Sequence, residues 1–172
     1  MTPKLFILEG ADSTGKSTHA RHLAKRLQAA YLHASGHRTL YEAMHAHHAA
    51  LINDAKVNLT NGVSVVMDRS WPSEVVYGSV LRPEHQFRFD PVAMQRMLHP
   101  LRPTYIHCRT DENSWKLYLD CHDEHDKEQF HRLEKTQYEA IAQQYDQFFM
   151  DVPHIVYQLG TIHIDTFITL LM

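Results

Sequence analysis

The stretch that decides the fold is Gly10-Ala11-Asp12-Ser13-Thr14-Gly15-Lys16-Ser17, which matches the pattern G-x-x-x-x-G-K-[ST] at every fixed position. Its glycines let successive backbone N–H groups point at phosphate oxygens, and the helix that follows directs its positive end at the same anion. The pattern therefore predicts a phosphate-binding loop in which Lys16 reaches the β- and γ-phosphates of ATP and the Ser17 hydroxyl holds Mg²⁺. The residues expected to contact ATP are Gly10, Ala11, Asp12, Ser13, Thr14, Gly15, Lys16, Ser17 and Thr18.

The segments on either side of this loop have the structure that the motif requires. Residues 4–8 form a short apolar run, which predicts a buried strand. Residues 16–29 place small and aliphatic side chains at helical spacing, with basic side chains on the other face. A strand that enters the loop and a helix that leaves it are the context in which this motif binds phosphate.

Strands and helices alternate along the rest of the chain. The further expected strands are residues 30–34, 63–67, 104–108 and 154–158. The further expected helices are residues 40–59, 73–81, 91–98, 111–119, 133–149 and 165–170. This alternation predicts an α/β protein of the P-loop NTPase fold, with a doubly wound parallel sheet of about five strands and helices on both faces. The 172 residues are the size of one domain, so we expect residues 1–172 to form a single P-loop kinase domain.

The composition excludes several other classes of protein. The net charge of −3 offers no general attraction to duplex DNA or to a membrane surface. Two cysteines, Cys108 and Cys121, cannot build a disulfide framework and are typical of a reducing compartment. No apolar run is long enough to span a membrane, and the first residues do not resemble a signal peptide. We therefore expect a cytoplasmic protein.

A second set of candidate residues follows the strand at 63–67. In a doubly wound sheet, ligands bind outside the carboxyl ends of the strands, and Asp68-Arg69-Ser70 stands at such an end. Asp68 is the candidate carboxylate for Mg²⁺, and Arg69 is the candidate cation that neutralises phosphoryl oxygens during transfer. With Lys16, these two residues are the predicted catalytic groups.

At this point the residues resemble a family. The run from Phe6 to Asp12, with Glu9-Gly10 before Gly15-Lys16-Ser17, is similar to the opening of thymidylate kinases. The segment from Asp68 to Gly78 is similar to the Asp-Arg motif of that family, in the Asp-Arg-Ser form of its small, often phage-borne relatives. The resemblance implies that Asp12 lies near the sugar hydroxyl of a nucleotide acceptor and that Arg69 binds the acceptor or transferred phosphate. The acceptor residues it implies are Asp12, Arg69, Ser73, Tyr77 and Arg82. The base-reading Pro/Arg pattern of the family is not evident between Ser35 and Tyr41, where Arg38 is the available cation and a further candidate for the acceptor.

The family resemblance also implies a mobile lid, and here the sequence departs from the family. We expect a helical lid at about residues 116–132, a stretch that is acidic and rich in histidine rather than arginine. The cations it offers to the phosphates are Lys116, Lys127 and Arg132. A structural zinc ion on Cys121, His122 and His125 is the alternative, although no second Cys/His pair follows at ligand spacing.

These observations predict an ATP- and Mg²⁺-dependent phosphotransferase. The leading hypothesis is a thymidylate kinase-like nucleoside monophosphate kinase. A first alternative is a kinase of the same fold with another acceptor, either a deoxynucleoside or a hydroxymethylated base such as 5-hydroxymethyluracil in phage DNA. A second alternative is a non-catalytic nucleotide-binding switch. The resemblance also implies a homodimer formed through the helices at 40–60 and 71–81.

Overall fold

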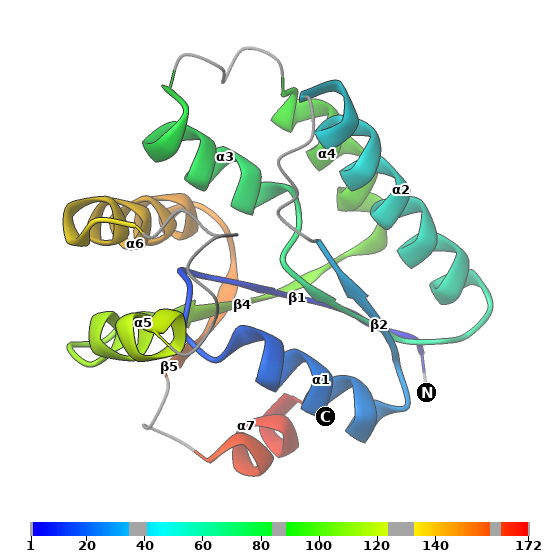
Figure 1. Cartoon of the computed structure of the whole chain (residues 1–172). Coiled ribbons are helices and arrows are strands. Elements are labelled where there is room, and N and C mark those ends of the chain that lie inside the picture. The colour runs from blue at the N-terminus through cyan, green and yellow to red at the C-terminus, as the bar shows by residue number, and fades with distance from the viewer. Residues whose placement is uncertain (1, 35–40, 84–88, 124–132, 159–162, 172) are drawn as a thin grey trace.

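A single parallel sheet forms the centre of the molecule (Figure 1). The computed structural model describes residues 2–34, 41–83, 89–123, 133–158 and 163–171. The strands are β1 (Leu5–Glu9), β2 (Ala30–His33), β3 (Val65–Asp68), β4 (Thr104–Arg109) and β5 (His154–Gln158), in the order β2-β3-β1-β4-β5. All four strand pairs are parallel. Together with the helices, this confirms the predicted doubly wound α/β fold of about five strands.

Helices cover both faces of this sheet. They are α1 (Lys16–Leu27), α2 (Tyr41–Thr60), α3 (Trp71–Leu81), α4 (Pro91–Leu98), α5 (Ser114–Asp123), α6 (Lys135–Met150) and α7 (Ile164–Leu171), with a short 3₁₀ turn at His99–Leu101. In Figure 1, α1 and α7 lie below the sheet, and α2, α3, α4 and α6 lie above it. No helix among the described residues is both long and apolar enough to cross a membrane.

The alternation of side chains along each strand divides the core into two layers. In β1, Phe6 and Leu8 pack with the side chains of α1 and α7. Leu5 and Ile7 point the other way and pack with α2, α3, α4 and α6. Because every residue of β1 is buried, its residues from Leu5 to Leu8 form one continuous apolar run rather than an alternating one. The same alternation determines on which face of the sheet each polar side chain at the strand ends lies.

Several boundaries differ from the predicted ones, and the structure shows the reason at the end of β3 and at the start of α5. β3 ends at Asp68 rather than at Met67, because Asp68 is still paired in the ladder with Leu8 on one side and with His33 on the other. α5 begins at Ser114 instead of at Asp111. The Asp111 carboxylate accepts hydrogen bonds from the backbone N–H of Asn113 (3.0 Å) and the hydroxyl of Ser114 (2.7 Å), which forms a turn before the helix. α5 then runs to Asp123, four residues beyond the predicted end and into the expected lid.

Candidate active site

The loop between β1 and α1 has the backbone conformation of a phosphate cradle. Gly10 has φ 150°, and a Cβ at this position would lie 2.2 Å from the carbonyl oxygen of Cys108, so only glycine fits beside β4. Ser13 and Gly15 also have positive φ, at 59° and 78°, which turns the chain tightly into α1. The hydroxyl of Thr14 donates to the carbonyl of Ala11 (2.9 Å) and braces the loop from inside. The loop is therefore shaped before any ligand arrives.

Lys16 lies within this loop. Its side chain is buried, and its ammonium donates to the carbonyl oxygen of Ala11 and to the Thr14 hydroxyl (3.3 Å). Burial and the positive charge of Arg69 together lower the pKa of Lys16 to about 8, against the opposite effect of Asp12. A phosphate in the cradle would supply the negative charge that this buried ammonium needs.

Arg69 is the residue that joins the loop to the end of β3. Its φ of 68° is unusual for a residue with a side chain, and its backbone N–H donates to Leu8 O (3.0 Å), which ties the turn to β1. The guanidinium, only 15% exposed, forms an ion pair with Asp12 on the phosphate loop. The guanidinium also donates to three hydroxyl groups, those of Ser73 (3.1 Å), Tyr145 (3.2 Å) and Tyr77 (3.0 Å). The Tyr77 ring also lies against it, 4.8 Å from the guanidinium carbon.

A buried carboxylate lies beneath this guanidinium. Glu9, the last residue of β1, is fully buried and accepts hydrogen bonds from the backbone N–H of Ser70 (2.6 Å), the hydroxyl of Ser73 (2.6 Å) and the hydroxyl of Tyr145 (3.3 Å). Burial raises the pKa of Glu9 to about 7, although the Ser73 hydrogen bond and the Arg69 charge lower it. The two hydroxyls therefore connect Arg69 to Glu9, and they fix the guanidinium from the side facing the core.

Asp68 lies on the opposite face of the sheet from Glu9. It belongs to the same face as Val66, which packs in the α1 layer, so it lies on the side where α1 begins. Its side chain is fully buried. One oxygen, Oδ2, accepts hydrogen bonds from the Tyr31 hydroxyl (2.8 Å) and from Nδ1 of His33 (3.0 Å). The other, Oδ1, has no hydrogen-bond partner among the residues that the structure describes.

The structure brings together part of the predicted site. Asp12, Arg69, Ser73 and Tyr77 share one network at the carboxyl ends of β1 and β3, as described above. Ser17 is half-buried in the first turn of α1, and the next residue, Thr18, is exposed.

Other predicted residues lie elsewhere. Arg82 forms an ion pair with Glu74 (2.8 Å), and Lys116 is exposed on α5. Arg38, Lys127 and Arg132, together with most of the expected lid and His125 of the alternative zinc site, lie outside the described residues.

Five residues of the site were not among the predicted ones: Glu9, Tyr31, His33, Tyr138 and Tyr145. Tyr138 and Tyr145 belong to the buried stripe of α6, and the Tyr138 hydroxyl donates to the backbone carbonyl of Asp12 (2.9 Å). Hydroxyl groups within an otherwise apolar helical stripe are a signal that the sequence does contain. Tyr31 and His33 are two residues apart on β2, so their side chains share one face of the strand. Only the strand register shows that this face lies beside Asp68.

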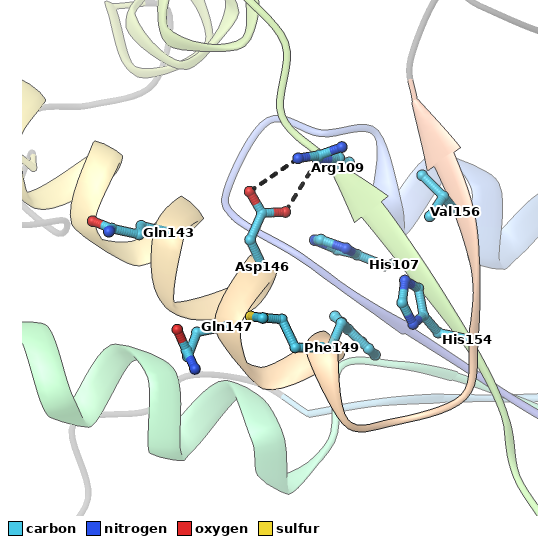
Figure 2. Close-up of a pocket in the computed structure, with 9 residues that line it drawn as sticks. His107, Arg109, Gln143, Asp146, Gln147, Phe149, His154 and Val156 are labelled. Carbon is cyan, nitrogen blue, oxygen red and sulfur yellow. Dashed lines mark hydrogen bonds and ion pairs between the residues drawn. The ribbon is translucent and has the colours of Figure 1, made fainter.

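A separate hollow of about 330 Å³ lies between α6 and the strands β4 and β5 (Figure 2). Arg109 and Asp146 form an ion pair at its edge (3.1 Å), and His107 stacks on Phe149 within it, with ring centroids 4.5 Å apart. None of the predicted site residues lines this hollow. This hollow is therefore separate from the predicted site.

Comparison with known proteins supports the fold. No protein-family model and no curated protein matches the chain. Among solved structures, the chain is similar to deoxyadenosine kinase from M. mycoides with the products dCMP and a flexible dCDP bound (TM-score 0.62, 14% identity, 97% of this chain and 96% of that chain). It is also similar to the YorR protein from Bacillus subtilis in complex with phosphorylated GDP (TM-score 0.64, 16% identity, 98% of this chain and 93% of that chain).

These likenesses and the phosphate cradle define the class: the chain has the α/β P-loop NTPase fold. At such low identity the likeness establishes the fold, and the activity has to be argued from the site itself.

Proposed function

We propose that this protein is an ATP-dependent kinase that transfers the γ-phosphoryl group to a nucleoside monophosphate, in the manner of a thymidylate kinase. The observation that carries the proposal is the ion pair between Asp12 and Arg69. In this ion pair one carboxylate and one guanidinium lie side by side at the phosphate loop. Each is the partner of the other in the free protein, and a bound substrate would replace both contacts. A nucleotide acceptor offers a partner to both, since its sugar hydroxyl donates and its phosphate accepts.

The donor side of the site is formed by the phosphate loop. The loop's backbone N–H groups and Lys16 would bind the ATP phosphates, and Lys16 would follow the γ-phosphoryl group as charge develops on it. The side chains present also fit a magnesium ion: Ser17 supplies a hydroxyl, and Asp68 supplies a buried oxygen, Oδ1, that has no partner among the described residues. When bound, Mg²⁺ would neutralise charge on the β- and γ-phosphate oxygens.

The acceptor side follows from the network around Arg69. An oxygen of the acceptor phosphate attacks the γ-phosphorus, the bond to the β–γ bridging oxygen breaks, and ADP leaves. That attacking oxygen is already anionic, so no side chain has to remove a proton. Arg69 would bind both the acceptor phosphate and the γ-phosphate and so reduce the repulsion between them. The hydroxyl groups of Ser73, Tyr77 and Tyr145 hold its guanidinium in position.

A second candidate is a deoxynucleoside kinase. One specific observation favours it: two carboxylates, Glu9 and Asp12, lie around the single guanidinium of Arg69 and offset its charge. A 5′-hydroxyl loses a proton when it attacks, and a carboxylate can accept that proton. The M. mycoides protein of similar fold is itself a deoxyadenosine kinase.

A panel of acceptors tests these functions. Purified protein is incubated with ATP and Mg²⁺ and, in parallel reactions, with dTMP, other deoxynucleotides, deoxynucleosides and DNA that contains hydroxymethyluracil, while ADP release is followed. Release that depends on a monophosphate supports the proposal. Transfer only to nucleosides supports the second candidate, and transfer only to DNA contradicts both. Nucleotide binding without release of ADP in any reaction would identify a switch rather than a kinase.

A further inference from the structure

The buried carboxylate of Asp68 is held asymmetrically. Its Oδ2 atom accepts two hydrogen bonds, from Tyr31 and His33, whereas its Oδ1 atom is buried and has no partner among the described residues. A buried oxygen without a hydrogen-bond partner destabilises the fold, so such an atom calls for an explanation. The two donors add to the asymmetry because they bind one oxygen and leave the other open.

The register of the sheet creates this arrangement. His33 and Asp68 are direct partners in the parallel pair of β2 and β3, and Tyr31 lies two residues earlier on the same face of β2. The Tyr31 ring is in turn covered by Arg21 of α1, whose guanidinium carbon lies 5.6 Å from the ring centroid. Arg21 is one helical turn after Ser17, so both share a face of α1. Tyr31, which donates to Asp68, is therefore connected through Arg21 to the first turn of α1, next to the phosphate loop.

We propose that Tyr31 and His33 are positioning residues that hold Asp68 through Oδ2 so that Oδ1 remains available for the magnesium ion of the ATP complex. This inference rests on the proposed function, in which Asp68 serves Mg²⁺. Hydrogen bonds from a second layer of residues orient a metal-binding carboxylate, and their loss commonly weakens metal affinity tenfold to a hundredfold. Tyr31 and His33 reach neither the metal nor the phosphates in this role, because they act through Asp68.

The experiment measures how much Mg²⁺ strengthens nucleotide binding rather than how fast the enzyme turns over. The dissociation constant of a non-hydrolysable ATP analogue is determined by calorimetry in EDTA and in saturating Mg²⁺, and the ratio of the two values is the magnesium gain. Wild type is compared with Asp68→Asn, Tyr31→Phe, His33→Ala and His33→Asn. An asparagine retains an N–H donor close to the position of Nδ1. It should therefore restore the contact that alanine removes.

Two matched controls separate positioning from general stability. Tyr105→Phe also removes a hydroxyl from a strand tyrosine, but that hydroxyl has no hydrogen-bond partner among the described residues. His22→Asn alters another histidine that pairs with an aspartate: His22, in the middle of α1, contacts Asp165 of α7 at 2.9 Å. Melting curves for all variants show whether any loss reflects unfolding.

We expect the magnesium gain to fall about tenfold in Tyr31→Phe and in His33→Ala, to return in His33→Asn, and to stay at the wild-type value in both controls. Binding in EDTA should be unchanged in Tyr31→Phe, in both His33 variants and in both controls. If Asp68→Asn loses the gain while Tyr31→Phe and His33→Ala keep it, the positioning role is wrong and the proposed function stands. If Asp68→Asn keeps the wild-type gain, the magnesium role of Asp68 in the proposed function fails, and the inference fails with it.

Discussion

The guanidinium of Arg69 donates a hydrogen bond to the carboxylate of Asp12, across 57 positions of sequence. This contact links the third residue of the phosphate loop to the first residue after β3. It also explains how a carboxylate can lie beside a cradle built for phosphate, where a lone negative charge would repel the ligand. The pair is neutral as a unit, and in the proposed function substrate contacts would replace it without leaving either charge unpartnered.

Replacing Asp12 should affect the acceptor more than ATP. In Asp12→Asn the side chain keeps its size but loses its charge, so Arg69 loses its ion-pair partner and the sugar hydroxyl faces a neutral amide instead of a carboxylate. We expect the acceptor KM to rise or kcat to fall by roughly tenfold or more, with ATP affinity within about twofold of wild type. Steady-state kinetics with each substrate varied in turn measures this. Glu139→Gln, an exposed carboxylate on α6, is the control. An equal loss of ATP affinity would contradict the assignment of Asp12 to the acceptor side.

Lys16 should be essential for transfer and unfavourable for the stability of the free protein. Lys16→Met removes a charge-assisted contact to the transferring group, and we expect a loss on the order of 3 kcal/mol or more in transition-state stabilisation. The same change removes a buried ammonium whose pKa is lowered from 10.5 to about 8, so the ligand-free variant should be more stable at pH 7 by on the order of 1–3 kcal/mol. Single-turnover kinetics and denaturant titration give the two values. An active variant would overturn the role of the loop.

Protonation of Lys16 should also make ATP affinity depend on pH. In the free protein Lys16 loses its proton above about pH 8, whereas bound phosphate favours the charged form and raises this pKa. The complex therefore binds more protons than the free protein above pH 8, and affinity should be nearly constant below that pH and fall up to tenfold per pH unit above it. Calorimetry of the ATP analogue between pH 6.5 and 9.5 measures the slope. The slope should be absent in Lys16→Met, and its persistence there would assign the titration to another group.

Glu9 should make the stability of the fold depend on pH as well. Its pKa is raised from 4.5 to about 7, so between these values the folded chain binds more protons than the unfolded chain. The contribution of Glu9 to stability is thus fully present below pH 4.5 and is lost as the pH rises through 7, by on the order of 2–3 kcal/mol. Glu9→Gln should flatten this part of the profile. Denaturant titrations of both proteins at pH 5 and pH 7.5 provide the comparison, and parallel profiles would show that Glu9 is not the titrating group.

Much of the fold could be predicted because its signals are local. The loop motif, the apolar strands before and after it, and the helical spacing of α1 each lie within a short stretch of sequence. Their alternation is enough to predict a parallel sheet with helices on both faces, since parallel strands need crossover connections. The ends of the elements were less predictable. Asp68 belongs to β3 because its backbone still pairs with both neighbouring strands, although aspartate is uncommon in strands.

The amino-acid sequence by itself determined the phosphate cradle, because its backbone shape depends on glycines and neighbours within eight consecutive positions. Only the tertiary structure decided which side chains face that cradle. The order β2-β3-β1-β4-β5 sets β3 beside β1 and β2 beside β3, and so brings Arg69 to Asp12 and His33 to Asp68. The pleat then sends Glu9 to the α6 side and Asp68 to the α1 side. These placements depend on contacts between residues far apart in the chain, which no local pattern encodes.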